Sequence, residues 1–176
     1  LMNSLYGALG NRWFRYFDQR VAESVTLGGQ LSILWAERTV NKEMNKLMST
    51  DDVDYVIAID TDSLYVNMGE LVQKFNPKNP VKFLDEICKS HFEKVFTDSY
   101  QELADYTGAM TNRMEMGREV IADRGIWVAK KRYILNVHNS EGVQYKEPKL
   151  KIMGIEAIKS STPELVRDNM KKLFNI

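Results

Sequence analysis

The sequence has very little cysteine: Cys88 is the only one among its 176 residues, so no disulfide can form within the chain. This excludes a small secreted module held by disulfides and fits a reducing compartment, where the thiol serves as a small apolar group. No apolar run approaches the roughly 18 residues of a membrane span, and residues 1–10 lack the charged-then-apolar layout of a signal peptide. Internal repeats and low-complexity tracts are also absent. We therefore expect a globular chain without a membrane partner.

The charges are distributed unevenly, although the formal net charge is zero. Residues 1–123 contain 13 Lys or Arg against 19 Asp or Glu, whereas residues 124–176 contain 11 against 5. An acidic portion beside a basic one suits carboxylates that bind cations and a basic stretch that binds phosphates. The alternative is a solvated surface whose charges merely segregate along the chain. The hydrophobic content of 44% is ordinary for one domain or one lobe of a larger protein.

Helical and strand-like periods alternate along the chain, which predicts an α+β fold. Residues 1–10 have apolar groups at helical spacing but begin without a cap, as a helix cut in its middle would. Gly28 and Gly29 either interrupt their helix or allow close packing. Thr162 and Pro163 are expected as the N-cap and first turn of a last helix. Helices are expected at residues 1–10, 18–48, 81–106 and from 163; strands at 53–59, 64–67, 113–121, 126–137 and from 149; and a loop at 76–80.

Two aspartates, Asp60 and Asp62, follow the apolar strand of residues 53–59, which we expect to be buried. Carboxylates two positions apart on a tight hairpin can point to one side, because strand side chains alternate in direction. Their charges repel each other unless a cation joins them, and Mg²⁺ typically takes one or two carboxylates together with substrate phosphates. A metal site at the hairpin tip is one interpretation. The other is structural, with Asp60 and Ser63 as caps of the turn.

A second group is basic: Lys130, Lys131 and Arg132 follow one another inside the predicted strand, with Tyr133 next. Three consecutive cations put charge on both faces of a strand, which a bound polyanion explains. The alternative is an edge strand that its lysines protect against aggregation.

The third group, Asn3, Ser4, Tyr6 and Gly7, places polar and small residues among apolar ones on a helix. Taken alone it indicates core packing. Trp13, Trp35, Phe92 and the nine methionines are likewise interpreted as core residues rather than as stacking platforms for bases.

In chain order, these groups resemble three motifs of the family B DNA polymerases: Asn3-Ser4-Leu5-Tyr6-Gly7, Asp60-Thr61-Asp62-Ser63 and Lys130-Lys131-Arg132-Tyr133. In that family the corresponding patterns are Lys-x-x-x-Asn-Ser-x-Tyr-Gly on a fingers helix, Tyr-Gly-Asp-Thr-Asp-Ser on a palm hairpin and Lys-Lys-Arg-Tyr on a palm strand. Residues 149–156 and 159–163 are similar to the palm-to-thumb junction of T-even bacteriophage polymerases. The resemblance spans nearly the whole chain. It implies part of a polymerase palm, an antiparallel sheet with helices packed on one face.

The resemblance also implies a domain plan and a reaction. Residues 1–12 would end a fingers helix, residues 13–148 would form palm, and residues 149–176 would form the palm-to-thumb junction and the start of the thumb. The reaction would be nucleotidyl transfer from a deoxynucleoside triphosphate to a primer 3′-hydroxyl, with two Mg²⁺ ions, or Mn²⁺, as cofactors. Asp62 would be the main catalytic metal ligand and Asp60 a secondary one.

The remaining site residues follow from the same resemblance. Asn3 and Tyr6 would bind the incoming nucleotide, with Tyr6 also beneath the nascent base pair of the DNA. Glu119 would be an auxiliary metal-binding carboxylate. DNA contacts along the primer are implied for Lys130, Lys131, Arg132 and Tyr133, and a backbone contact at the base of the thumb for Lys159.

The sequence departs from the family pattern in several places. The fingers lysine and the first metal-binding aspartate of the family fall upstream of Leu1, so this chain alone is expected to be inactive. Ala58 and Ile59 stand where many relatives have Tyr-Gly. Many relatives also have two acidic residues ahead of the basic motif; the second falls on Glu119, but the first falls on Gly117.

The implied partners are primer–template DNA, a deoxynucleoside triphosphate and the rest of the polymerase chain, with a sliding clamp as a further candidate. The implied location is the cytoplasm, that of an infected bacterial host if the source is a phage. Two other functions remain open. One is a DNA-binding module that has lost catalysis; the other is a cyclase-like palm that binds nucleotides with two metals.

Overall fold

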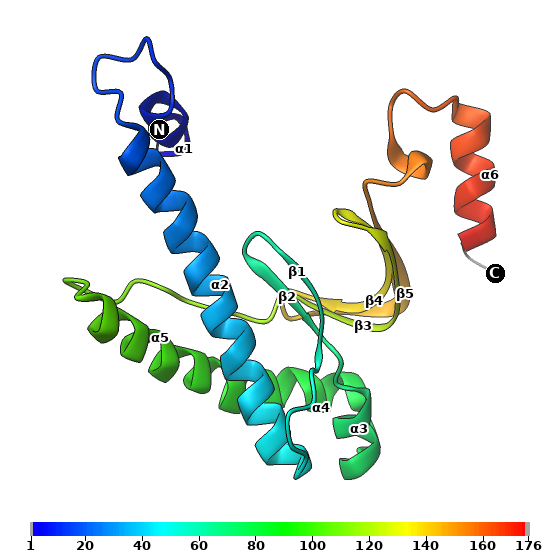
Figure 1. Cartoon of the computed structure of the whole chain (residues 1–176). Helices are drawn as coiled ribbons and strands as arrows, with labels where there is room; N and C mark the ends of the chain where they lie inside the picture. The colour runs from blue at the N-terminus through cyan, green and yellow to red at the C-terminus, as the bar shows by residue number, and fades with distance from the viewer. Residues whose placement is uncertain (1, 175–176) are drawn as a thin grey trace. The chain divides into compact units, whose positions relative to one another are not determined.

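The computed structural model describes residues 2–174, with side chains from residue 4 on, as a mixture of helices and antiparallel strands (Figure 1). The expected α+β class is confirmed. The chain divides into two compact units, each made of two stretches of sequence. Unit 1 comprises Leu1–Phe75 and Lys94–Met116, and unit 2 comprises Asn76–Glu93 and Gly117–Ile176. Between residues 2 and 174 the strands form two separate sheets, one of two strands and one of three.

Unit 1 is built around a long helix. Its elements are α1 (Met2–Leu9), α2 (Gln19–Met48), the hairpin β1 (Val56–Asp60) and β2 (Ser63–Val66), α3 (Gly69–Phe75) and most of α5 (Glu93–Thr107). Ala36 of α2 is buried with Tyr100 and Leu103 of α5. The indole Nε1 of Trp35 donates to the Ser99 carbonyl at 3.0 Å and to its hydroxyl at 2.8 Å. Burial and these hydrogen bonds together join α2 to α5.

Capping residues define both ends of helix α2. The Asp18 carboxylate accepts from the Arg20 N–H at 2.9 Å, and Ser49 ends the helix in the left-handed region, with φ 59°. Gly28 and Gly29 lie inside the uninterrupted helix, and no described atom lies within 4 Å of the Cβ that either would carry. Neither interpretation of this glycine pair, an interruption or a close approach, is therefore correct.

Two asparagines of α2 fix the start of β1. Asn41 Oδ1 accepts from the Tyr55 N–H at 2.8 Å, and Asn45 exchanges hydrogen bonds with the N–H and carbonyl of Val53 at 3.0 and 2.7 Å. A side-chain amide carries the same donor and acceptor as a peptide group, so the two asparagines take the place of a neighbouring strand. The hairpin that carries Asp60 and Asp62 is thus attached to the longest helix of its unit.

Unit 2 contains a three-stranded antiparallel sheet in the order β3-β4-β5. The strands are β3 (Val120–Ala129), β4 (Arg132–Ser140) and β5 (Val143–Met153). The other elements are α4 (Pro80–Ile87), the π-helix η1 (Cys88–Phe92), the 3-10 helix η2 (Glu156–Ile158) and α6 (Glu164–Phe174). The central strand β4 buries every second residue, which is the pattern of a sheet with one covered face.

Several predicted boundaries are wrong. Residues 113–119 form no strand, because β3 begins at Val120, and residues 126–137 are not one strand, because a turn at Lys130 and Lys131 separates β3 from β4. Strand β5 begins at residue 143 rather than at residue 149. The sequence does not predict helix α3. Helix α6 begins at residue 164, one residue after Pro163. Lys131 has φ 61°, a left-handed conformation that turns usually give to glycine or asparagine. The turn at Lys130 and Lys131 therefore cannot be predicted from the residue types that occupy it.

Burial also differs from expectation at particular residues. The predicted strand of residues 53–59 is only partly buried: Tyr55 is 3% exposed, whereas Ile57 is 52% exposed. Phe92 is a core residue as predicted, and Trp35 is partly buried, but Trp13 is 94% exposed and does not belong to a core. None of the helices between residues 2 and 174 combines the length and the apolarity that crossing a membrane requires.

Candidate functional site

The tip of the β1–β2 hairpin presents the two aspartates. Asp60 ends β1 and pairs with Ser63, the first residue of β2, so Thr61 and Asp62 alone form the turn. The Asp62 N–H donates to the Asp60 carbonyl at 2.7 Å, and Thr61 has φ 54°. The Thr61 hydroxyl donates to Asp60 Oδ1 at 3.1 Å. The Ser63 hydroxyl donates to Asp62 Oδ1 at 3.4 Å, so each carboxylate accepts a hydrogen bond from the hydroxyl of the residue that follows it.

These two carboxylates fit a divalent cation in their chemistry. Asp62 is exposed and Asp60 is half-buried, and carboxylate oxygens are the ligands that Mg²⁺ prefers. Residues 2–174 contain no group of three or more His, Cys, Asp or Glu side chains that could hold a metal ion. Asp60 and Asp62 are therefore a partial donor set, which phosphate oxygens, water or other carboxylates would have to complete. Both belong to unit 1, whereas Glu119 belongs to unit 2.

Tyr6 lies on α1 with its ring exposed. Its hydroxyl hydrogen-bonds to the Thr26 hydroxyl of α2 at 2.9 Å. No described atom lies within 4 Å of the Cβ position of Gly7, the next residue. The side chain of Asn3 lies outside the described residues. Tyr6 is thus held by α2 while its ring still faces solvent.

Half of the basic motif is a turn: Lys130 and Lys131 lie between the strands, whereas Arg132 and Tyr133 begin β4. Ala129 pairs with Arg132, so Lys130 and Lys131 project from the end of the β3–β4 hairpin, where both are exposed. The predicted placement of three cations on the two faces of a strand is wrong. The alternative, an edge strand protected by lysines, also fails, because neither lysine lies in a strand and Arg132 begins the central strand.

The chain returns to this hairpin end at residues 154–159. Gly154 has φ 65°, and a Cβ on it would lie 2.2 Å from the Lys131 carbonyl oxygen, so only glycine fits there. Two residues later, Glu156 accepts from Arg132 Nη2 at 2.7 and 2.5 Å and from Lys159 Nζ at 3.0 Å. Lys159 therefore joins the hairpin end, although 27 residues separate it from Arg132 in the sequence. We define the basic surface as Lys130, Lys131, Arg132 and Lys159.

Glu156 is the acidic partner of this surface. The hydrogen bond from Lys159, and the charge of Arg132, lower the pKa of its carboxyl below the usual 4.5. The carboxylate is therefore ionised at neutral pH and offsets one of the four positive charges. Glu156 ends the stretch that is similar to the palm-to-thumb junction. No pattern in the sequence predicts that it pairs with Arg132.

Tyr133, the last residue of the basic motif, is 6% exposed. Its ring lies 6.3 Å from that of Trp127, the residue opposite it on β3. In this structure it packs inside unit 2, directly beneath the basic surface at the start of β4.

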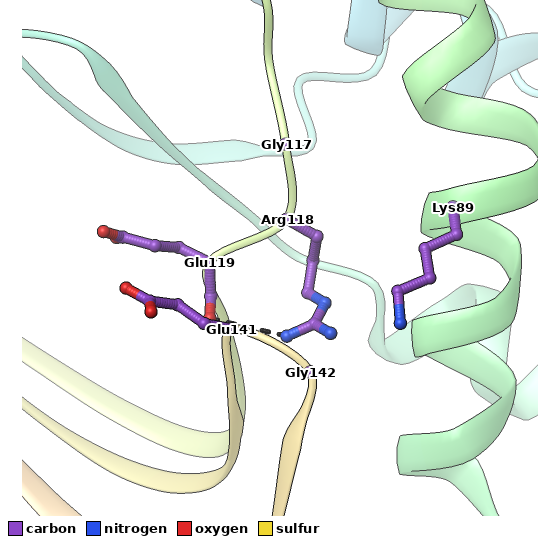
Figure 2. Close-up of a pocket in the computed structure, with 6 residues that line it drawn as sticks. All are labelled: Lys89, Gly117, Arg118, Glu119, Glu141 and Gly142. Carbon is purple, nitrogen blue, oxygen red and sulfur yellow. Dashed lines mark hydrogen bonds between the residues drawn. The ribbon is translucent and has the colours of Figure 1, made fainter.

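Glu119 lines a pocket of about 310 Å³ in unit 2 (Figure 2). Its carbonyl accepts from the Glu141 N–H at 2.7 Å, which places the segment before β3 beside the β4–β5 turn. Figure 2 shows the Glu119 and Glu141 side chains extending in the same direction, away from Arg118 and Lys89. The Glu119 carboxylate is 63% exposed and lies 3.9 Å from Lys151 Nζ, so it remains accessible.

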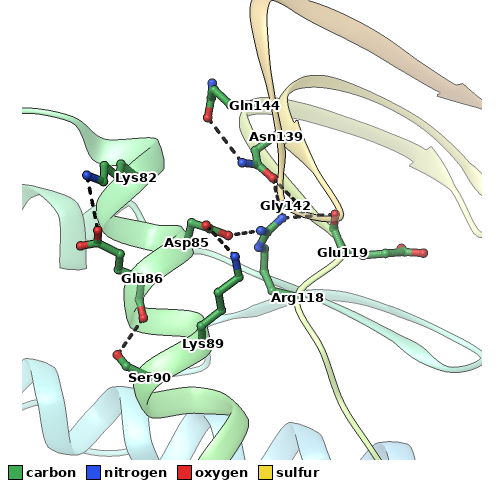
Figure 3. A network of polar contacts seen from close by, with 10 residues as sticks. All are labelled: Lys82, Asp85, Glu86, Lys89, Ser90, Arg118, Glu119, Asn139, Gly142 and Gln144. Carbon is green, nitrogen blue, oxygen red and sulfur yellow. Dashed lines mark hydrogen bonds and ion pairs between the residues drawn. The ribbon is translucent and has the colours of Figure 1, made fainter.

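Arg118 holds this segment in place (Figure 3). Its guanidinium forms an ion pair with Asp85 of α4 and donates to Asn139 Oδ1 at 2.8 Å, while the side chain is only 8% exposed. Asn139 Oδ1 also accepts from the Gly142 N–H at 3.2 Å. The hydrogen bond from Lys89 and then that from Arg118 lower the pKa of Asp85. The sequence does not single out Arg118 and Asp85 as site residues, because their pairing depends on how α4 meets the sheet.

No family model matches the sequence. It is 42% identical over 186 residues to the DNA-directed DNA polymerase of Escherichia phage RB69, and 41% identical over 186 residues to the DNA-directed DNA polymerase of Enterobacteria phage T4. Each comparison covers 98% of this chain but 21% of the relative, so the chain spans about a fifth of the length of these two proteins.

Proposed function

We propose that this chain forms the central part of the palm of a T4-like DNA-directed DNA polymerase, because 98% of its length is 41–42% identical to two such enzymes. In this assignment residues 1–12 end the fingers helix, residues 13–148 are palm, and residues 149–176 lead into the thumb. The observation that carries the proposal is the β1–β2 hairpin, which presents Asp60 and Asp62 together at its tip.

The proposed reaction is nucleotidyl transfer to a primer 3′-hydroxyl. Asp62, and secondarily Asp60, would hold divalent ions, with Glu119 as an auxiliary carboxylate. Bound Mg²⁺ ions would lower the pKa of the attacking hydroxyl and neutralise charge on the leaving group. The contribution of the chain itself is a pair of carboxylates on a turn that Thr61 and the Asn41 and Asn45 contacts hold in place.

Tyr6, with Asn3, would test the shape of the new base pair. The minor groove offers a hydrogen-bond acceptor at nearly the same place in every correct pair. A hydroxyl held by Thr26 and presented on an exposed ring suits that task. Such a contact discriminates correct from incorrect pairing without preferring one sequence.

The basic surface would hold the primer strand. It brings four cations together at one end of the β3–β4 hairpin, and two of them contact the Glu156 carboxylate. Contacts of this kind to phosphates position DNA without reading its sequence. The partners proposed are therefore primer–template DNA, a deoxynucleoside triphosphate and the rest of the polymerase chain, in the cytoplasm of an infected bacterium.

The test uses the full-length polymerase. Asp62→Ala should lower primer extension on the order of 10²-fold or more, since lost stabilisation of a transferring phosphoryl group costs several kcal/mol. Primer–template binding should change little. The control is Thr61→Ser, which keeps the hydroxyl that reaches Asp60 and should retain activity. Full activity of Asp62→Ala would remove the catalytic assignment, and a full-length protein that binds DNA without extending primers would favour the non-catalytic module.

A further inference from the structure

Glu156 links two cations that are far apart in the sequence. One guanidinium nitrogen of Arg132, Nη2, donates to both of its carboxylate oxygens, and Lys159 Nζ donates to one of them. All three side chains are between 41% and 44% exposed, so the cluster lies at the surface. The two cations cannot separate without breaking a charge-assisted hydrogen bond.

The backbone that carries Glu156 is held by its buried neighbours. Ile155 and Ala157, on either side of Glu156, are 6% and 0% exposed, so both neighbours are anchored in the interior. Glu156 also begins the 3-10 helix η2, and its carbonyl accepts from the Lys159 N–H at 3.3 Å. Gly154 meets the Lys131 backbone just before this helix. Burial of these neighbours and the close approach at Gly154 therefore set where the backbone presents the Glu156 side chain.

We propose that Glu156 is a positioning residue for phosphate binding. It holds the side chains of Arg132 and Lys159 next to each other, so that N–H groups of both can donate to one phosphate of the primer strand. Arg132 Nε is buried, so the donors that remain for a phosphate are those of Arg132 Nη1 and the N–H groups of Lys159 Nζ that Glu156 does not engage. This inference rests on the proposed function, because it assigns a DNA contact to the basic surface. It adds a residue that takes no direct part in that contact.

Whether Glu156→Gln raises or lowers the affinity for DNA distinguishes a positioning role of Glu156 from a purely electrostatic one. Glu156→Gln removes a negative charge from the basic surface, so electrostatics alone predicts tighter binding of DNA. Positioning predicts the opposite: affinity of the full-length polymerase for a primer–template duplex should fall about two- to tenfold, the range of one lost hydrogen bond. The salt dependence of the affinity should flatten by about 0.9 in slope if the variant neutralises one phosphate fewer than the wild type.

Three further variants complete the experiment. Glu147→Gln removes an exposed carboxylate of β5 and should leave the affinity unchanged or slightly raised. Glu156→Asp keeps the charge on a shorter side chain and should bind more weakly than the wild type, since it cannot reach both cations. In the Arg132→Ala, Lys159→Ala background, Glu156→Gln should no longer weaken binding, because nothing remains for it to position.

The outcomes are distinct. If Glu156→Gln binds DNA as tightly as the wild type or more tightly, Glu156 acts only through its charge and the inference is wrong. The inference is equally wrong if the substitution weakens binding as much in the doubly substituted background. If the wild type itself does not bind primer–template DNA, the proposed function fails instead.

Discussion

Arg118 has a buried guanidinium whose charge is balanced by Asp85. Because the pKa of Asp85 is lowered by Lys89 and Arg118, the ionised carboxylate is favoured in the folded chain relative to the unfolded one, where the pKa is near 3.8. Its stabilising contribution is fully present above that unfolded value and is lost as the pH falls through the lower folded value.

Asp85→Asn should therefore lower the free energy of unfolding at neutral pH, by about 2 kcal/mol, because a buried guanidinium loses its charged partner. The variant should also lose less stability than the wild type as the pH falls from neutral to below the unfolded value near 3.8. Urea unfolding at several pH values measures both effects. Parallel pH profiles for the two proteins would contradict the role given to this pair.

Gly154 is a second single residue on which the basic surface depends. Gly154→Ala puts a Cβ 2.2 Å from the Lys131 carbonyl oxygen, at a positive φ that disfavours any side chain. We expect a loss of about 1–3 kcal/mol in the free energy of unfolding. Gly117→Ala is the matched control, since no described atom lies within 4 Å of its Cβ position and no positive φ is involved. Similar losses for the two variants would argue against a close approach at residue 154.

At the scale of elements, the sequence predicts those helices and strands whose ends and spacing are set by neighbouring residues. Helix α2 is expected at residues 18–48 and occupies Gln19–Met48, because Asp18 caps it and its apolar residues keep helical spacing. The sequence does not predict the β3–β4 turn, because Lys130 and Lys131 are not turn-forming residues and tertiary contact with Gly154 stabilises their backbone. The aspartate hairpin is predictable, but the links of Glu156 to Arg132 and of Arg118 to Asp85 depend on packing between elements that no local pattern encodes.

The β3–β4 hairpin end supports a prediction about DNA. Replacing Lys130 and Lys131 together by alanine in the full-length polymerase should weaken primer–template binding. The slope of log affinity against log salt should fall by about 0.9 for each phosphate that the protein no longer neutralises. Fluorescence anisotropy at several salt concentrations gives both numbers. The matched control replaces Lys42 and Lys46 of α2, which removes the same charge from unit 1. An equal effect of the two double substitutions would show that the contribution is overall charge and not a local interaction.

At the scale of the whole molecule, the chain corresponds to about a fifth of the polymerases that it resembles. Under the proposed function, the fingers lysine and the first metal-binding aspartate that the resemblance implies are not among residues 1–176. A purified polypeptide of these residues should therefore extend no primer above the level of its own Asp62→Ala variant, with either Mg²⁺ or Mn²⁺. Primer extension that Asp62→Ala abolishes would show that these residues suffice for catalysis.

The backbone conformation of Thr61 in the β1–β2 turn is energetically unfavourable. A β-branched residue at φ 54° occupies a region that disfavours L-residues by about 1–2 kcal/mol, and it does so between the two aspartates. Glycine or asparagine at this position would relieve the strain, but would also give up the hydroxyl that reaches Asp60. If the hairpin tip has the proposed catalytic role, a substitution that raises the stability of the turn would therefore be expected to lower activity.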